Sequence, residues 1–120
     1  MYTVTDTDDV LCARIRLKPN MLNTVREWAA FMTTHRDAAQ QTLLAEGVHI
    51  ESVFLEQTSE GDFLIYYMRS VNQAQAEAVA RQSTAMIDEY HRQFKHTCWQ
   101  GGQHLELLID LLPALALSKV

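Results

Sequence analysis

The segment VHIESVFLEQTSEGDFLIYYMRS, residues 48–70, predicts a β-hairpin. Its two arms, 48–58 and 62–70, are rich in the β-branched and aromatic residues that favour extended backbone. The tripeptide SEG at 59–61 separates them, and a short loop that contains glycine between two such runs is typical of a hairpin. Apolar residues occupy both faces of the first arm: Ile50 and Phe54 lie on one, Val53 and Leu55 on the other. The sequence leaves open which face meets the core.

Two further segments predict the rest of a sheet. In VLCARIRL, residues 10–17, apolar and polar side chains alternate, which is typical of a strand with one face toward a core. The apolar face holds Leu11, Ala13, Ile15 and Leu17, and the other holds Cys12, Arg14 and Arg16. HLELLIDLL, residues 104–112, predicts a last strand. We expect Leu105, Leu107 and Ile109 to face the core, and His104, Glu106 and Leu108 to share the opposite face with the arginines.

Helical periodicity separates these strands. Apolar residues spaced by three or four follow Asn20, a plausible N-cap, and the pattern blurs at residues 33–37. This predicts either one long helix or two with a kink near residues 34–36, ended by Gly47 in a left-handed conformation. Asn72 and Gln75 resemble a capping box, so a second helix is expected from there to about Trp99, followed by a loop at QGGQ, residues 100–103.

The element order βαββαβ predicts an α+β, ferredoxin-like domain. With right-handed crossovers the simplest arrangement is a four-stranded antiparallel sheet in the spatial order 4-1-3-2, with the helices on one face. We expect one domain over residues 10–112, a flexible lead-in at 1–9 and a tail at 113–120.

Composition narrows the class of protein. The 120 residues carry a net charge of −5 and no basic cluster, which argues against a nucleic-acid partner. No apolar run approaches the roughly 20 residues that span a bilayer, and the polar, acidic start is unlike a signal peptide. The two cysteines lack metal-ligand spacing and are expected to be free thiols. We therefore expect a cytoplasmic protein with no membrane association.

The face of the sheet that lacks helices predicts a partner. Strands that are apolar on both sides are usually buried on both sides, so we expect a second copy of the chain to cover this face through a twofold axis. Arg14 and Arg16 are expected beside Glu106 in this sheet, most simply as a cross-strand salt bridge at the dimer interface. Alternatively, the arginines orient an anionic group of a substrate.

The helical stretch STAMIDEYHRQFKHTC, residues 83–98, concentrates the polar side chains. His91 lies at the border of an apolar stripe, and Asp88, three residues earlier, could orient its imidazole. The pair is a candidate for acid–base chemistry, and the alternative is a structural histidine at the edge of the core. Ser83 is expected to pack within the stripe. His96 points well away from His91, so two ligands at most come from this helix and no metal is expected.

Four stretches together resemble a family of small bacterial proteins, DUF6176. They are IRLKPNMLNTVREWAAF (15–31), GVHIESVFLEQTSEGDFLIYYMRS (47–70), STAMIDEYHRQF (83–94) and LELLIDL (105–111). The resemblance implies a place in the dimeric α+β barrel group, which includes cofactor-independent monooxygenases, haem-degrading enzymes, dehydratases and ligand-binding regulators. The polar residues in the matching motifs are Trp28, Glu51, Tyr66, Tyr67, Ser83, Asp88 and His91. No position matches the haem-ligating histidine, so no cofactor is expected.

Three functions are consistent with these features. The first is a homodimer that binds a small apolar or aromatic molecule between sheet and helices. The second is a cofactor-independent, monooxygenase-like enzyme with His91 and Asp88 as its acid–base pair. The residues expected to orient substrate in that site are Trp28, Arg14, Glu51, Tyr66, Tyr67 and Ser83. The third is a structural dimer without a pocket.

Overall fold

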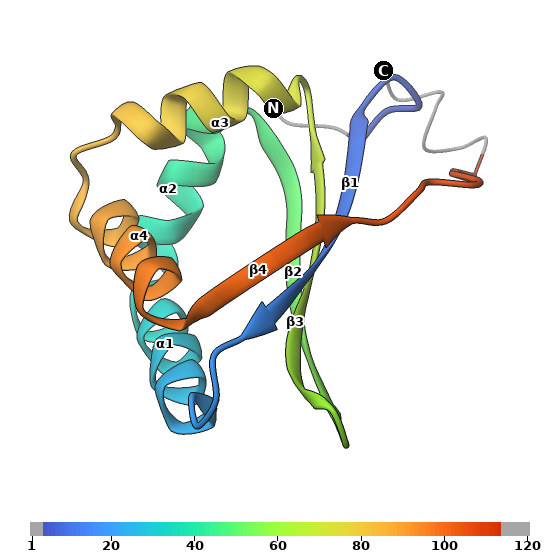
Figure 1. Ribbon diagram of the computed structural model, residues 1–120. Coiled ribbons are helices and arrows are strands. Elements are labelled where there is room, and N and C mark those ends of the chain that lie inside the picture. The colour runs from blue at the N-terminus through green and yellow to red at the C-terminus, as the bar shows by residue number, and fades with distance from the viewer. Residues whose placement is uncertain (1–3, 114–120) are drawn as a thin grey trace.

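A computed structural model describes residues 4–113 of the chain. Its elements are β1 (Asp9–Leu17), α1 (Leu22–Thr34), α2 (Arg36–Glu46), β2 (Val48–Thr58), β3 (Gly61–Ser70), α3 (Gln73–Gln82), α4 (Met86–Cys98) and β4 (Trp99–His104). The strands form one antiparallel sheet in the order β2-β3-β1-β4, and the helices cover one face of it (Figure 1). The predicted α+β class and strand order are confirmed. Residues 1–3 of the expected lead-in and 114–120 of the tail lie outside the described residues.

Strand register decides which face of the hairpin meets the helices. Ala13 of β1 pairs with Tyr66 of β3, which pairs with Val53 of β2. Because directly paired residues share a face, this row continues the buried apolar side of β1. Phe54 belongs to the opposite face and is 60% exposed. From Glu51 onward, after a register shift between Val48 and Ile50, the hairpin therefore turns its odd-numbered β2 residues toward the helices.

Each crossover contains two helices. The first breaks at His35, between α1 and α2, and Gly47 ends α2 with a φ of 73°, as the sequence predicts. The second helix, predicted to run unbroken from residue 72 to about 99, is instead divided between Gln82 and Met86. The Ser83 hydroxyl accepts a hydrogen bond from the Ala85 amide at 3.2 Å, and such local bonds compete with helix formation.

The predicted last strand is displaced along the chain. β4 occupies residues 99–104, including the expected QGGQ loop, and residues 105–113, here called the C-terminal arm, continue beyond the sheet. A Cβ at Gly102 would lie 2.5 Å from Ile15 Cδ1, so glycine lets β4 approach β1 closely. His104 pairs with Ala13 and thus lies on the helical face, opposite to the expectation.

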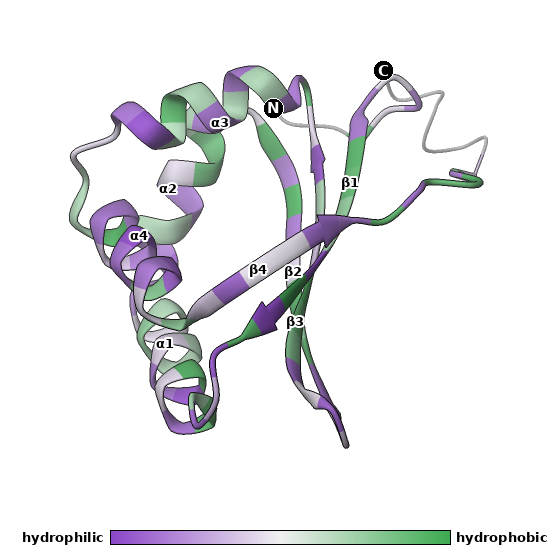
Figure 2. Ribbon diagram, in the orientation of Figure 1, coloured by the Kyte–Doolittle hydropathy of each residue, from purple (hydrophilic) through white to green (hydrophobic). Residues whose placement is uncertain are grey.

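The arm is largely apolar (Figure 2), and its large hydrophobic residues are exposed rather than buried. Three residues expected to face the core, Leu105, Leu107 and Ile109, keep 42%, 54% and 70% of their surface exposed. The Leu105 amide still donates to the Cys12 carbonyl at 2.8 Å, and after this bond the chain leaves β1. The sequence predicted an apolar strand over residues 104–112. Its pairing with β1 ends at His104, the first residue of that segment.

The core lies mainly under α1 and α4. Its buried residues are Ala13, Ile15, Leu17, Val25, Trp28, Leu64, Tyr66, Phe94 and Cys98. Trp28 of α1 stacks on Phe94 of α4 with ring centroids 4.5 Å apart. In contrast, α2 has no buried residue and α3 has only Ala76. The packing therefore joins α1 and α4 tightly to the sheet and leaves α2 and α3 less closely packed. None of the helices within residues 4–113 is long and apolar enough to cross a membrane.

On the face opposite the helices, the arginines of β1 differ from the expectation. Arg14 Nε donates to Glu56 Oε1 of β2 at 2.9 Å, rather than pairing with Glu106, which lies in the arm. The guanidinium carbons of Arg14 and Arg16 lie 3.6 and 4.5 Å from the centre of the Phe63 ring. The two side chains therefore cover an aromatic ring on this open face, and both are engaged.

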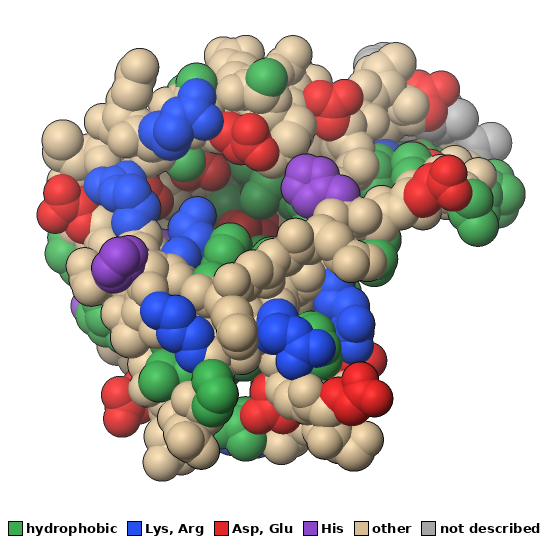
Figure 3. Space-filling model, viewed as in Figure 1, with side chains coloured by type: hydrophobic (Ala, Val, Ile, Leu, Met, Phe, Trp, Pro, Cys, Tyr) green, Lys and Arg blue, Asp and Glu red, His purple; other side chains and the backbone are tan. Residues whose placement is uncertain are grey.

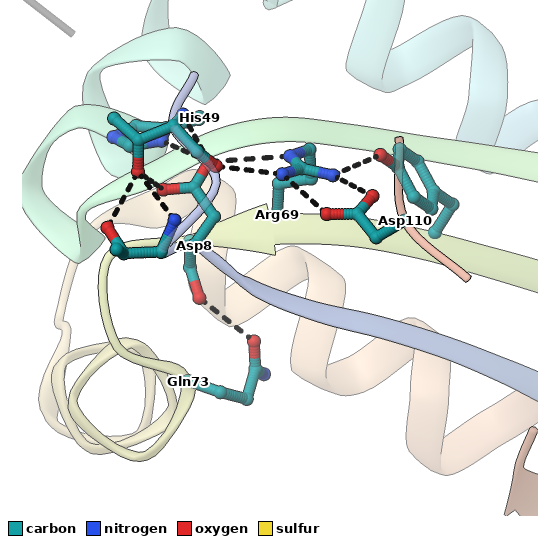
Figure 4. Close-up of polar contacts among 9 residues, drawn as sticks. Asp8, His49, Arg69, Gln73 and Asp110 are labelled. Atoms are coloured by element: carbon teal, nitrogen blue, oxygen red, sulfur yellow. Dashed lines mark hydrogen bonds and ion pairs between the residues drawn. The ribbon is translucent and has the colours of Figure 1, made fainter. Parts of the chain in front are cut away.

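Arg69 joins both ends of the described chain to the sheet (Figure 4). It is 3% exposed, and its Nη1 and Nη2 donate to the two carboxylate oxygens of Asp110 in the arm at 2.7 and 3.1 Å. Its Nε donates to Asp8 Oδ2 at 3.3 Å, and His49 Nδ1 donates to the same oxygen at 3.0 Å. Although burial opposes ionisation, the bonds from His49 and Thr5 hold the pKa of Asp8 below its ordinary value.

Replacing Arg69 with glutamine should destabilise the protein strongly. The substitution removes the cation between Asp8 and Asp110, and breaking a buried ion pair costs about 3–5 kcal/mol. Urea denaturation at pH 7 measures the loss of unfolding free energy. Arg26→Gln is the matched control, because Arg26 is exposed on α1 and should change stability by less than about 0.5 kcal/mol. A loss as small as that of the control would show that the network contributes no stability.

Candidate functional site

A cavity of about 640 Å³ lies between the sheet and the helices. All eight elements contribute to its wall, and the residues from α2 and α3 that border it include the small Ala39, Ala76 and Ala80. The space-filling view is hollowed between α3, α4 and β4, with hydrophobic and acidic side chains visible in its depth and basic ones on its helical side (Figure 3). This volume is within the range of small-molecule sites.

Aromatic side chains form one side of the cavity. Trp28, Tyr66, His91 and Trp99 all border it, from α1, β3, α4 and β4. The Trp28 and His91 rings stack with centroids 5.7 Å apart, and the Tyr66 and Trp99 rings meet edge to face at 5.3 Å. Such a wall offers flat apolar surface to a ligand together with a few polar atoms, which suits aromatic molecules.

The hydrogen bond from Trp28 sets the protonation of His91. The indole Nε1 donates to His91 Nδ1 at 3.1 Å, so Nδ1 is the acceptor and a neutral imidazole carries its proton on Nε2. Burial, and then the positive charge of Lys95, lower the pKa of His91 to about 4. At neutral pH the ring is therefore uncharged, and Nε2 is a hydrogen-bond donor rather than a base.

Four carboxylates border the same cavity, from four different elements, and Glu77 of α3 accepts a hydrogen bond from Gln73 Nε2 at 3.3 Å. Glu46 is the last residue of α2, Glu51 lies on β2, and Asp88 lies in the first turn of α4. Burial, together with the charges of Asp88 and Glu51, raises the pKa of Glu46 to about 7. Glu51 keeps part of its surface exposed, but the protein atoms around its carboxyl desolvate it, and this desolvation raises its pKa also.

Two buried polar atoms near the cavity lack a hydrogen-bond partner among the described residues. They are the Tyr66 hydroxyl oxygen and Trp99 Nε1, and Tyr66 is only 6% exposed. Burial and the charge of Glu51 raise the pKa of Tyr66, against a smaller lowering by the nearby Trp99 indole, so the phenol is neutral. A buried polar atom without a partner costs about 1–3 kcal/mol, so a ligand that bonds to these atoms would recover free energy.

The residues predicted for a site lie in three places. Trp28, Glu51, Tyr66, Asp88 and His91 all border the cavity. Arg14 and Tyr67 do not, because paired residues share a face: both lie on the opposite side of the sheet from Ala13 and Tyr66. Ser83 borders a separate, shallower hollow between α2 and the α3–α4 link. Over residues 4–113, no hydrogen bond joins Asp88 to His91, so Trp28 rather than Asp88 orients the imidazole.

Sequence reasoning missed several residues of the cavity wall. Lys95 lies four residues after His91, a spacing that places both on one side of a helix, and this could have identified it. Glu46, Trp99 and His104 gave no comparable indication, because Trp99 was assigned to a helix and His104 to the other face of the sheet. Within the described range, no group of three His, Cys, Asp or Glu side chains could hold a metal ion.

Comparison with known proteins identifies the family. Residues 9–115 match the model of a family of unknown function, DUF6176, and the chain belongs to this family. It is similar to the crystal structure of PA3566 from Pseudomonas aeruginosa, with a TM-score of 0.55 and 12% identity over 88% of this chain and 99% of that one.

A second solved structure, the NE2512 protein of unknown function from Nitrosomonas europaea, has a TM-score of 0.48 and 17% identity over 88% of this chain and 94% of that one. No match to a curated protein was found. At these identities the similarity to PA3566 supports the fold alone.

Replacing Trp28 with phenylalanine should raise the pKa of His91 while leaving it below 6.5. The substitution removes the donor that stabilises the neutral ring, a change of about one pKa unit for a typical hydrogen bond, whereas burial persists. An NMR titration of the imidazole measures the pKa, and nitrogen shifts of the wild type should show the proton on Nε2. Trp99→Phe is the control, since Trp99 also borders the cavity but is not the residue bonded to His91. Equal shifts in both variants would refute the assigned role of Trp28.

Proposed function

We propose that this protein is a cytoplasmic homodimer that binds a small apolar or aromatic molecule in the cavity between sheet and helices. The observation that carries the proposal is the cavity itself, with its aromatic side and its buried polar atoms without partners. Ligand sites combine mostly apolar walls with a few polar groups that fix orientation. The free thiols of Cys12 and Cys98 agree with a reducing compartment.

We favour ligand binding over a reaction in which His91 and Asp88 act as an acid–base pair. An imidazole with a pKa of about 4 is a weak base at neutral pH, and efficient general bases have pKa values near the working pH. His91 suits a different role, in which Nε2–H donates a hydrogen bond to an acceptor on the ligand. Its stacking on Trp28 fixes the direction of that bond.

One observation supports the alternative of a cofactor-independent, monooxygenase-like enzyme. Glu46 borders the cavity with a pKa of about 7, which suits a carboxylate that accepts a proton from a substrate. In that case Glu46→Gln would abolish turnover and retain binding of the substrate. A binding protein would have no turnover to lose.

The exposed apolar surface supports the homodimer. Phe54 on the open face and five residues of the C-terminal arm are exposed, the arm residues being Leu105, Leu107, Leu108, Ile109 and Leu111. Large contiguous apolar surface on a protein usually marks an interface. A second copy related by a twofold axis would cover the open face and supply apolar surface to the arm. The third alternative, a purely structural dimer, has no use for a cavity of this size.

Filling the cavity should weaken binding of a neutral aromatic probe. In Ala80→Phe, a ring on α3 would enter the cavity, and we expect the affinity for Nile red to fall at least tenfold, about 1.4 kcal/mol. Fluorescence titration of the folded variant gives the affinity. Ala74→Phe adds the same ring to an exposed position of α3 and should bind the probe as the wild type does. If Ala80→Phe also binds normally, the cavity is not the probe's site.

A charge on the open face should dissociate the dimer. Phe54→Glu would place a carboxylate in the proposed interface, and sedimentation equilibrium should give the mass of a monomer. Met86→Glu introduces the same charge at a similarly exposed position, 56% against 60%, on α4, and should remain dimeric. His91→Ala, inside the cavity, should leave the dimer intact. Dissociation of the Met86 variant instead would move the interface to the helical side.

A further inference from the structure

We infer that the ligand of this cavity carries a cationic amine, held by the carboxylates of Glu46, Glu51 and Asp88. The inference rests on the proposed function, that the cavity binds a small apolar or aromatic molecule. It narrows that class to molecules that join an apolar or aromatic body to an ammonium group.

The first observation is negative charge without a partner. Over residues 4–113, none of the three carboxylates lies within 4.0 Å of a basic group or accepts a side-chain hydrogen bond. They converge from α2, β2 and α4 on one cavity, and Glu46 experiences the charges of both other carboxylates. Glu46 and Asp88 are half-buried, and a carboxylate partly removed from water is costly unless a cation accompanies it.

The basic groups at the cavity are engaged elsewhere. Arg92 donates to the carbonyls of Ala80 and Ser83 at 2.8 and 2.7 Å, which closes the end of α3. Lys95 Nζ lies 5.2 Å from the centre of the Trp99 ring, and its charge acts on Glu46 and Glu51 only from a distance. Two cations, Arg92 and Lys95, against four carboxylates, Glu77 included, leave the cavity lining with net negative charge.

The backbone of α2 adds to this charge. Glu46 is the last residue of the helix, and the last turn of α2 contains no basic residue. The C-terminal end of a helix carries partial negative charge, which favours a cation there and disfavours a carboxylate. Asp88, by contrast, lies in the first turn of α4, where the helix favours its ionised form.

An independent observation comes from Tyr66. Its side chain, only 6% exposed, borders the cavity and ends in a hydroxyl oxygen without a partner, close enough to Glu51 to feel its charge. A phenol oxygen can accept a hydrogen bond from an ammonium group. The faces of Trp28, Tyr66 and Trp99 also attract cations when water is excluded. An anionic ligand would meet repulsion here, and a neutral one would leave the carboxylates unpaired.

Three compounds that share a ring and a three-carbon chain test the inference. They are 3-phenylpropylamine, 3-phenylpropanol and 3-phenylpropionate, measured by displacement of Nile red and by calorimetry at pH 7.5. We expect the amine to bind at least tenfold more tightly than the alcohol, and the propionate most weakly. Glu51→Gln should reduce the preference for the amine to about threefold or less without changing the affinity for the alcohol. Glu46→Gln should act in the same direction and serves if the Glu51 variant does not fold.

Glu27→Gln is the matched control, because it changes net charge equally from an exposed position of α1. An equal loss of amine preference in this control would overturn the inference, since the effect would then be one of overall charge. If the amine binds no better than the alcohol while Nile red binding still depends on Ala80, the inference fails and the proposed function stands. If Nile red binding is insensitive to Ala80→Phe, the proposed function fails with it.

Discussion

The uneven packing of the helices against the sheet determines the rest of this structure. Large side chains, above all Trp28 stacked on Phe94, fill the space under α1 and α4 and fix those helices to the sheet. The helices α2 and α3 carry alanines where they face the sheet, at Ala39, Ala76 and Ala80, and these are too small to fill the space beneath them. Protein interiors are normally close-packed, so the cavity marks the place where the side chains of α2 and α3 leave the space above the sheet unfilled.

This packing also determines the chemistry of the cavity wall. The same Trp28 that fills the core donates the hydrogen bond that fixes the tautomer of His91. Because the wall excludes much of the surrounding water, charges there act on one another strongly, and Glu46 and His91 shift their pKa values in opposite directions for the same reason. Stability and site therefore depend on one contact between α1 and α4, and a change at Trp28 would affect both.

The parts of the fold that depend on local pattern could be predicted from the sequence. Alternation along β1, the hairpin, and Gly47 at the end of α2 follow from neighbouring residues, and right-handed crossovers then fix the strand order. The break before α4 and the position of β4 depend on a side-chain bond at Ser83 and on the contact of Gly102 with Ile15, which periodicity does not encode. Likewise, the sequence identified five residues that border the cavity. Glu46 reaches the same cavity only because of the distance between the helix layer and the sheet, which no single segment of sequence determines.

The strand order has a consequence for how the chain folds. β1 lies between β3 and β4, so the first strand of the chain finds both of its partners in the second half. Only the β2–β3 hairpin can form from adjacent segments, and loop closure over longer separations slows folding. On the ribosome, β1 and α1 would emerge with their apolar surfaces uncovered until Gly61 and the residues after it appear. Early exposure of this kind makes a nascent chain a substrate for chaperones. Because the β2–β3 hairpin forms from adjacent segments, it would be the nucleus on which the rest of the sheet assembles.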